Sequence, residues 1–106
     1  MMKVQSDNSP STVSEPRVTV VIPVPLRSFT DGQGEIEVAA NSVAKAIDVI
    51  GQRYDGLSTR ILTPEGAVRP LVNIFIDKDD IRSLDGLNTI LADGAVMAII
   101  PAIAGG

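Results

Sequence analysis

The chain has no cysteine, no histidine and no tryptophan among its 106 residues. Without cysteine it can form neither a disulfide nor a thiolate nucleophile. Without histidine it lacks the commonest general base and metal ligand of proteins. A serine-hydrolase triad of the usual kind is therefore excluded in this chain alone, and a metal site would need oxygen ligands only. The composition argues against an autonomous enzyme, and we expect neither a metal site nor a bound cofactor.

Positive charge and aromatic side chains are also scarce. Nine lysines and arginines stand against 13 acidic residues, and the aromatic residues are Phe29, Tyr54 and Phe75. A nucleic-acid surface normally needs a basic face or a stacking platform, so we expect no nucleic-acid partner. The six arginines follow no motif and are interpreted as surface charges. We expect the chain to be a monomer on its own.

The sequence has no long hydrophobic run. The longest nearly apolar stretch, residues 95–104, is too short for a membrane span and contains Pro101. The first residues lack the hydrophobic centre of a secretory signal. We therefore expect a cytoplasmic protein with no membrane partner. Residues 1–16 are rich in Ser, Pro, Asp and Asn, which predicts a flexible N-terminal tail.

Four segments carry strand patterns. The first is β-branched throughout and is followed by Pro23, which cannot donate a hydrogen bond to a sheet. The second alternates charged and apolar residues, as a half-buried strand does. The third is the strongest apolar segment, and the last follows a turn signal at residues 92–94. These patterns predict strands at residues 18–22, 35–38, 71–77 and 96–100, with a further short strand at 81–82.

One helix is predicted between the second and third strands. Asn41 or Ser42 can cap its first turn, and Gly56 is a suitable stop. Its apolar residues share one face at helical spacing and are Val43, Ala46, Ile47, Ile50 and Tyr54. The order of elements predicts an α+β domain over residues 17–100. We expect a β-grasp (ubiquitin-like) fold, with a mixed four- to five-stranded sheet and one main helix packed on one face.

An acidic group follows the third strand. Asp77, Asp79, Asp80 and Asp85 offer oxygen ligands that would suit a hard cation, but they lack the spacing of a calcium-binding EF-hand loop. We interpret this segment as a solvated hairpin loop.

The chain closes on Pro101, Ala102, Ile103, Ala104, Gly105 and Gly106. A frayed terminus is the plain interpretation, but it does not account for Ile103 or for two final glycines. Glycine has no Cβ, so such a tail can enter a narrow channel and bring its carboxylate close to another backbone or a phosphate. Beyond Pro101, five residues reach on the order of 16 Å. We expect residues 101–106 to form an extended C-terminal tail.

Taken together, these segments resemble the MoaD/ThiS family of ubiquitin-like sulfur carriers. The resemblance covers about residues 17–106 and rests on residues 18–23, 71–77, 80–93 and 99–106. Within the family it is most similar to the CysO-type carriers of cysteine biosynthesis. One departure is Ala95, since family members often have an acidic residue after the Asp-Gly turn.

The resemblance implies a β-grasp fold and a chemistry for Gly106. An E1-like enzyme uses ATP to adenylate its carboxylate, and sulfur then replaces AMP to leave a thiocarboxylate. Residues Pro101 to Gly105 would insert into partner enzymes. In CysO-type systems the later partners are a PLP-dependent cysteine synthase and a metalloprotease. The chain itself would be a carrier and a substrate, not an enzyme.

Other functions remain open on the sequence alone. They are a thiamine-pathway sulfur carrier, the small subunit of molybdopterin synthase, a ubiquitin-like modifier attached to lysines, and a plain interaction domain. Phe75, Val96 and Ile100 are predicted to form a docking patch for a partner, or else to be ordinary core or edge residues.

Overall fold

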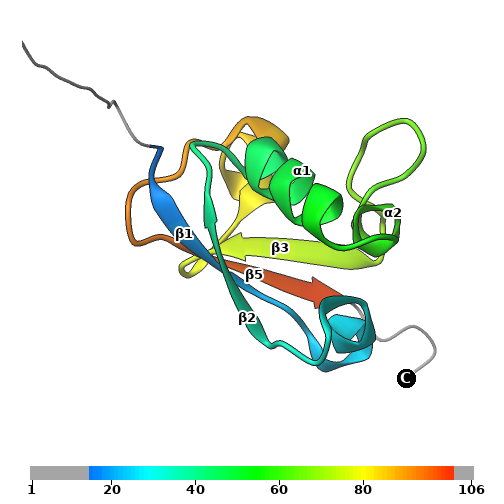
Figure 1. The fold of residues 1–106 in the computed structure, drawn as a ribbon. Coiled ribbons are helices and arrows are strands. Elements are labelled where there is room, and N and C mark those ends of the chain that lie inside the picture. The colour runs from blue at the N-terminus through cyan, green and yellow to red at the C-terminus, as the bar shows by residue number, and fades with distance from the viewer. Residues whose placement is uncertain (1–14, 102–106) are drawn as a thin grey trace, which may run out of the picture.

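The computed structural model describes residues 15–101, which form one five-stranded sheet covered by helices (Figure 1). The strands are β1 (Arg17–Val21), β2 (Glu35–Ala39), β3 (Val72–Ile76), β4 (Asp79–Asp80) and β5 (Val96–Pro101). The α-helices are α1 (Val43–Arg53) and α2 (Leu57–Ile61). Three 3₁₀ helices complete the described part: η2 (Val24–Thr30), η3 (Ile81–Ser83) and η4 (Gly86–Asn88).

The sheet is mixed, with the strand order β2-β1-β5-β3-β4. β1 and β5 are parallel neighbours, in a register that places Val20 opposite Met97. The remaining neighbours are antiparallel. The first and last strands of the chain therefore lie side by side near the centre of the sheet, as predicted for a β-grasp fold.

The core lies between α1 and one face of the sheet. Ser42 caps α1, because its hydroxyl oxygen accepts a hydrogen bond from the Lys45 backbone N–H at 3.2 Å. The buried stripe of α1 is the predicted one except for Tyr54, which is partly buried beyond the last helical residue. The sheet contributes Val18, Val20, Ile74, Met97 and Ile99, each at most 1% exposed. Burial of this apolar surface is the main driving force for the fold.

Several predicted boundaries are wrong in detail. The short strand is Asp79–Asp80, and Ile81 and Arg82 begin η3 instead. Gly56, with φ 82°, starts α2 instead of ending α1. Pro101 is the last residue of β5, so the strand runs one residue further than predicted. Pro16 was predicted to lie in the flexible N-terminal tail, but its carbonyl oxygen accepts a hydrogen bond from the Ala40 N–H at 3.0 Å.

Across residues 15–101, the structure contains no helix with the length and apolar character needed to cross a membrane.

Candidate functional site

The end of β5 sets where the C-terminal residues leave the fold. β5 lies between β1 and β3, and its last residue, Pro101, stands opposite Val72 of β3. Because β5 runs parallel to β1, Pro101 lies at the opposite end of this strand pair from Arg17. The predicted tail residues Ala102, Ile103, Ala104, Gly105 and Gly106 lie outside the described residues. The point from which they depart belongs to a strand that is paired on both sides.

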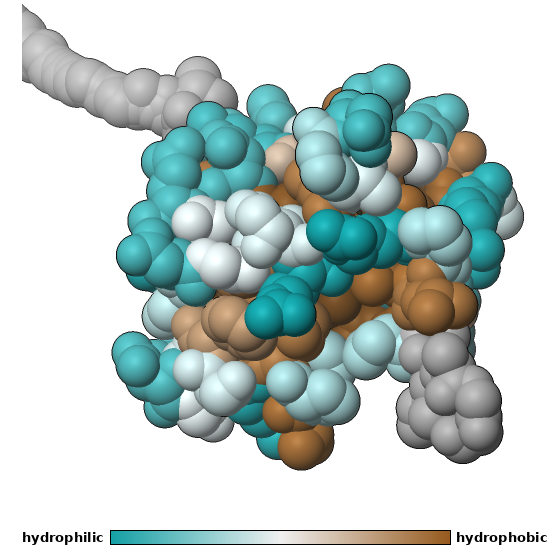
Figure 2. All heavy atoms as spheres, turned by 90° about the vertical axis from the view of Figure 1, so that its right-hand side faces the viewer, coloured by the Kyte–Doolittle hydropathy of each residue, from teal (hydrophilic) through white to brown (hydrophobic). Residues whose placement is uncertain are grey.

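The two faces of β5 differ in burial. Met97 and Ile99 point into the core and are 0% and 1% exposed. Val96 and Ile100 lie on the open face of the sheet and are 38% and 46% exposed. Figure 2 views the molecule from the end where β5 finishes and shows hydrophobic surface beside the point where the described chain stops.

The structure brings the three residues of the predicted docking patch to one face. Phe75 pairs with Ala98 in the register of β3 and β5, so its side chain lies on the same face as Val96 and Ile100. Phe75 is half-buried, while its neighbours Ile74 and Ile76 turn into the core. We call Phe75, Val96 and Ile100 the sheet-face patch. Its role in binding a partner stays a prediction.

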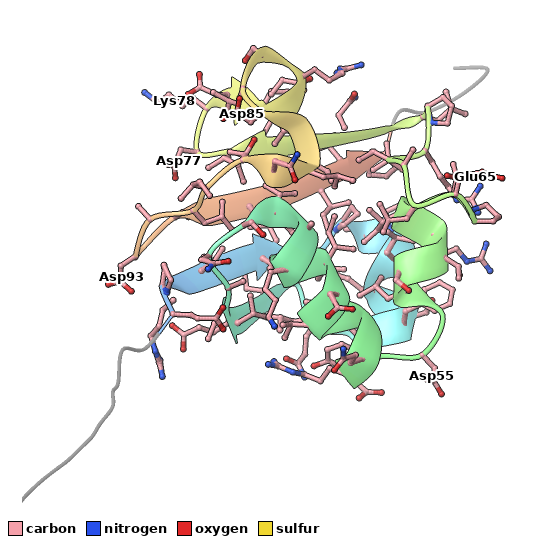
Figure 3. All side chains as sticks on the ribbon, turned by 90° about the horizontal axis from the view of Figure 1, so that it is seen from above. Asp55, Glu65, Asp77, Lys78, Asp85 and Asp93 are labelled. Atoms are coloured by element: carbon pink, nitrogen blue, oxygen red, sulfur yellow. The ribbon has the colours of Figure 1, made fainter. Side chains whose placement is uncertain are left out.

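The acidic group after β3 is used for local structure. Asp77, with φ 56°, makes the turn of the β3–β4 hairpin, and its carboxylate accepts a hydrogen bond from the Val96 N–H at 3.2 Å. Within residues 15–101, no three acidic side chains come together in a metal-binding arrangement. Figure 3 shows Asp77 and Asp85 at one end of the molecule, while Asp55 and Glu65 lie at the other.

Asp80 and Arg82 form an ion pair at the outer edge of the sheet. The Arg82 guanidinium lies 2.7 Å from the Asp80 carboxylate and also donates to the Asn73 side-chain oxygen at 2.8 Å. The hydrogen bond from the Arg82 side chain, followed by that from its backbone N–H, holds the pKa of Asp80 below its ordinary value. The same pair raises the pKa of Arg82.

Two arginines that the sequence analysis treated as ordinary surface charges share a hollow. It has a volume of about 450 Å³ and is lined by Phe29, Gly56, Thr59, Arg60 and Arg69. We call it the arginine hollow. No sequence pattern marks it, because its residues come from η2, α2 and the loop before β3, and only the fold brings them together.

The model of the ThiS family matches residues 20–106 of the chain. The chain belongs to the ThiS family. The match covers all of β5 and continues through the final glycines, so the predicted family resemblance is confirmed.

Individual relatives and solved structures support the same family assignment for this ThiS-family chain. Sulfur carrier protein CysO of Mycobacterium tuberculosis is 37% identical over 91 residues, which are 84% of this chain and 98% of that protein. A chain in the crystal structure of the Amycolatopsis orientalis BexX/CysO complex is 34% identical, with a TM-score of 0.79 over 84% of this chain and 99% of that one. Small archaeal modifier protein 3 of Haloferax volcanii is 34% identical over 65 residues, covering 61% and 70% of the two chains. The predicted β-grasp fold and the predicted similarity to CysO are both confirmed.

Proposed function

We propose that the chain is a sulfur carrier whose Gly106 carboxylate is adenylated and then converted to a thiocarboxylate. The observation that carries the proposal is the family match through Gly106, together with the position of β5, whose end at Pro101 precedes the C-terminal residues. A carrier of this kind needs a rigid domain for recognition and a thin end for chemistry. β5 supplies the base for such an end, since its first half pairs with both β1 and β3 and its last residues, through Pro101, pair with β3.

The proposed chemistry uses the main chain and no side chain. The Gly106 carboxylate oxygen attacks the α-phosphorus of ATP, which releases pyrophosphate and forms an acyl-adenylate. A sulfur nucleophile from a donor then attacks the carbonyl carbon, and AMP leaves with the electron pair of the broken C–O bond. ATP belongs to the activating enzyme. Because the chain has no cysteine, it has no thiol that could capture the acyl group.

We propose cysteine biosynthesis, in the cytoplasm, as the destination of the sulfur. Its support is the 37% identity to CysO over 98% of that protein. The partners would then be an E1-like activating enzyme, a PLP-dependent cysteine synthase and a metalloprotease. The BexX/CysO complex supports the general idea that such a chain works by docking on another protein.

The sheet-face patch would dock such a partner. Replacing Ile100 with Asp puts a charge at one end of this apolar surface and leaves the fully buried core residues in place, since Ile100 is 46% exposed. We expect weaker binding to the activating enzyme by a variant that is still folded, which thermal denaturation checks. Ala44→Asp, an exposed change on α1, which covers the other face of the sheet, adds the same charge and serves as the control. Equal binding by both variants would remove the patch from the proposal.

Reconstitution tests the function itself. The chain is incubated with ATP, a sulfide donor and the E1-like enzyme, and its intact mass is measured. We expect the mass increase of one oxygen-to-sulfur exchange, and none in a variant that lacks Gly106. An unchanged mass for the full chain, with an activating enzyme proven active on another carrier, would refute the proposal.

A second function is favoured by one observation. Small archaeal modifier protein 3 is 34% identical over 65 residues, and its name denotes a protein modifier. A modifier would form an amide between Gly106 and a lysine of a target protein. Tryptic digests of cells that express the chain would then contain branched peptides in which residues 83–106 are joined to a target lysine, because Arg82 is the last tryptic site of the chain.

A further inference from the structure

The arginine hollow lies at the end of the molecule where β5 finishes. Its five lining residues come from η2, α2 and the loop before β3, and two of them are arginines in a chain of net charge −4. Figure 2 looks onto this end of the molecule and shows strongly hydrophilic side chains next to hydrophobic ones. A local concentration of positive charge on an acidic protein is a feature that requires an explanation.

Both guanidinium groups are held in place by neighbours that carry no negative charge. Arg69 donates through Nε to the Thr59 carbonyl oxygen at 2.7 Å. The Arg60 guanidinium lies 5.0 Å from the centre of the Phe29 ring. A guanidinium has five N–H donors, so each arginine keeps donors for another ligand. Their side chains are positioned before any ligand arrives, which lowers the entropy cost of binding.

The positive charge of the hollow is not neutralised by a direct ion pair. Among residues 15–101, the ion pairs are Arg17 with Glu37 and Arg82 with Asp80. Asp55 and Glu65 lie at the same end of the molecule as the hollow (Figure 3), but neither is within ion-pair distance of Arg60 or Arg69. The hollow therefore presents two positioned guanidinium groups to an anionic group of another molecule.

The hollow lies near the end of β5, because Arg69 is hydrogen-bonded to a residue of β3 that pairs with the last residue of β5. The Arg69 carbonyl oxygen accepts a hydrogen bond from the Val72 N–H at 3.0 Å, and Val72 stands opposite Pro101 in the sheet. Leu71, which lies between Arg69 and Val72 in the sequence, is 53% exposed, and Ile100 is 46% exposed. Any protein that takes up residues 102–106 must come close to this surface.

We propose that the arginine hollow binds carboxylate side chains of the activating enzyme beside the channel that receives the C-terminal residues. The proposal rests on the proposed function, because it assumes that such an enzyme engages this end. Guanidinium groups pair with carboxylates through two parallel hydrogen bonds, which fixes orientation as well as adding affinity. The two guanidinium groups would also attract carboxylates of the enzyme surface toward the hollow.

Direct binding to the activating enzyme without ATP tests this. The variants are Arg60→Glu and Arg69→Gln, and the control is Lys45→Glu, an exposed change on α1 with the same charge difference as Arg60→Glu. At low salt we expect Arg60→Glu to weaken binding by roughly fivefold or more and Arg69→Gln by about twofold or more, while Lys45→Glu stays within about twofold. Added salt should weaken the unaltered chain more than Arg60→Glu. Thermal denaturation shows whether each variant is folded.

Three results would overturn the proposal. The first is that both arginine variants bind as tightly as the Lys45→Glu control. The second is that the unaltered chain does not bind the enzyme. The third is that inorganic pyrophosphate shifts the Arg60 and Arg69 Nε–H signals in NMR spectra and displaces the enzyme, which would assign the hollow to phosphate.

The result that would refute the proposed carrier function is different from the results that would refute the docking site. A chain that binds the enzyme through Arg60 but never gains sulfur at Gly106 would refute the carrier function and leave this docking site supported. Conversely, deletion of Gly105 and Gly106 should abolish sulfur loading while the salt-dependent binding through the hollow persists.

Discussion

At the scale of single residues, Asp80 joins three segments at the edge of the sheet. Its carboxylate accepts the Arg82 backbone N–H at 2.8 Å, and its ion pair aligns Arg82 with Asn73 of β3. The first of these bonds caps η3 and ends β4. It explains why Ile81 and Arg82 are helical, although the sequence predicts a short strand at residues 81–82.

Replacing Asp80 with Asn tests this role through its pH dependence. The pKa of Asp80 is lowered in the folded state, mainly by the Arg82 side chain, from an ordinary value of 3.8. Such a carboxyl contributes stability above its unfolded pKa and loses it as pH falls through the folded pKa. We expect the variant to lower the urea midpoint at about pH 7 and to lower it less at about pH 3. Equal losses at both pH values would show that charge is not the cause.

At the scale of elements, α1 and α2 touch at Gly51. A Cβ added to Gly51 would lie 2.8 Å from the Ser58 Cβ, closer than two such atoms can approach. This contact cannot be predicted from the sequence, because α2 has only five residues and no helical periodicity long enough to identify. α2 is nevertheless fixed by the burial of Leu57 and Ile61, both fully buried.

Gly51→Ala should therefore destabilise the protein. Helix propensity alone would favour alanine by about 1 kcal/mol, but overpacking against Ser58 costs about 1–3 kcal/mol. We expect a net loss of about 1 kcal/mol in the free energy of unfolding, measured with urea. In a Ser58→Gly background, where the opposing Cβ is gone, the same change should cost less. A stabilising effect of Gly51→Ala in the unaltered chain would contradict the contact.

Alternate residues of β5 point into the core and onto the open face of the sheet. Ile99 is 1% exposed and Ile100 is 46% exposed, although the two are neighbours with the same side chain. The alternation of residues 96–100 could be predicted from the sequence, but which set faces the core could not. That depends on the side of the sheet that α1 covers, which is a property of the whole fold.

This pair provides a matched comparison. Ile99→Ala leaves a cavity in the core and should lower the free energy of unfolding by about 2–5 kcal/mol. Ile100→Ala removes the same atoms from a partly solvated position, and we expect a loss under about 1 kcal/mol. Chemical denaturation of both variants measures the difference. Similar losses would contradict the difference in burial between the two faces of β5, and a larger loss for Ile100→Ala would mean that the faces are reversed.

At the scale of the whole molecule, the topology places the first and last strands side by side and the two ends of the described chain at opposite ends of the sheet. The parallel pair β1 and β5 carries the chain from Arg17 at one end of the sheet to Pro101 at the other. The order of elements and the helix stripe were enough to predict this arrangement, since long periodic segments dominate it. The arginine hollow was not predictable, because Phe29 is distant in sequence from Arg60 and Arg69, and no periodic element links the two arginines.

We propose above all that the main-chain carboxylate of Gly106 is the reactive group. Mass spectrometry of the C-terminal peptide, taken from cells that make the chain, measures this. We expect part of the peptide to carry sulfur in place of one oxygen at Gly106. A peptide found only with its free carboxylate, or only in amide linkage to the lysine of another protein, would contradict it.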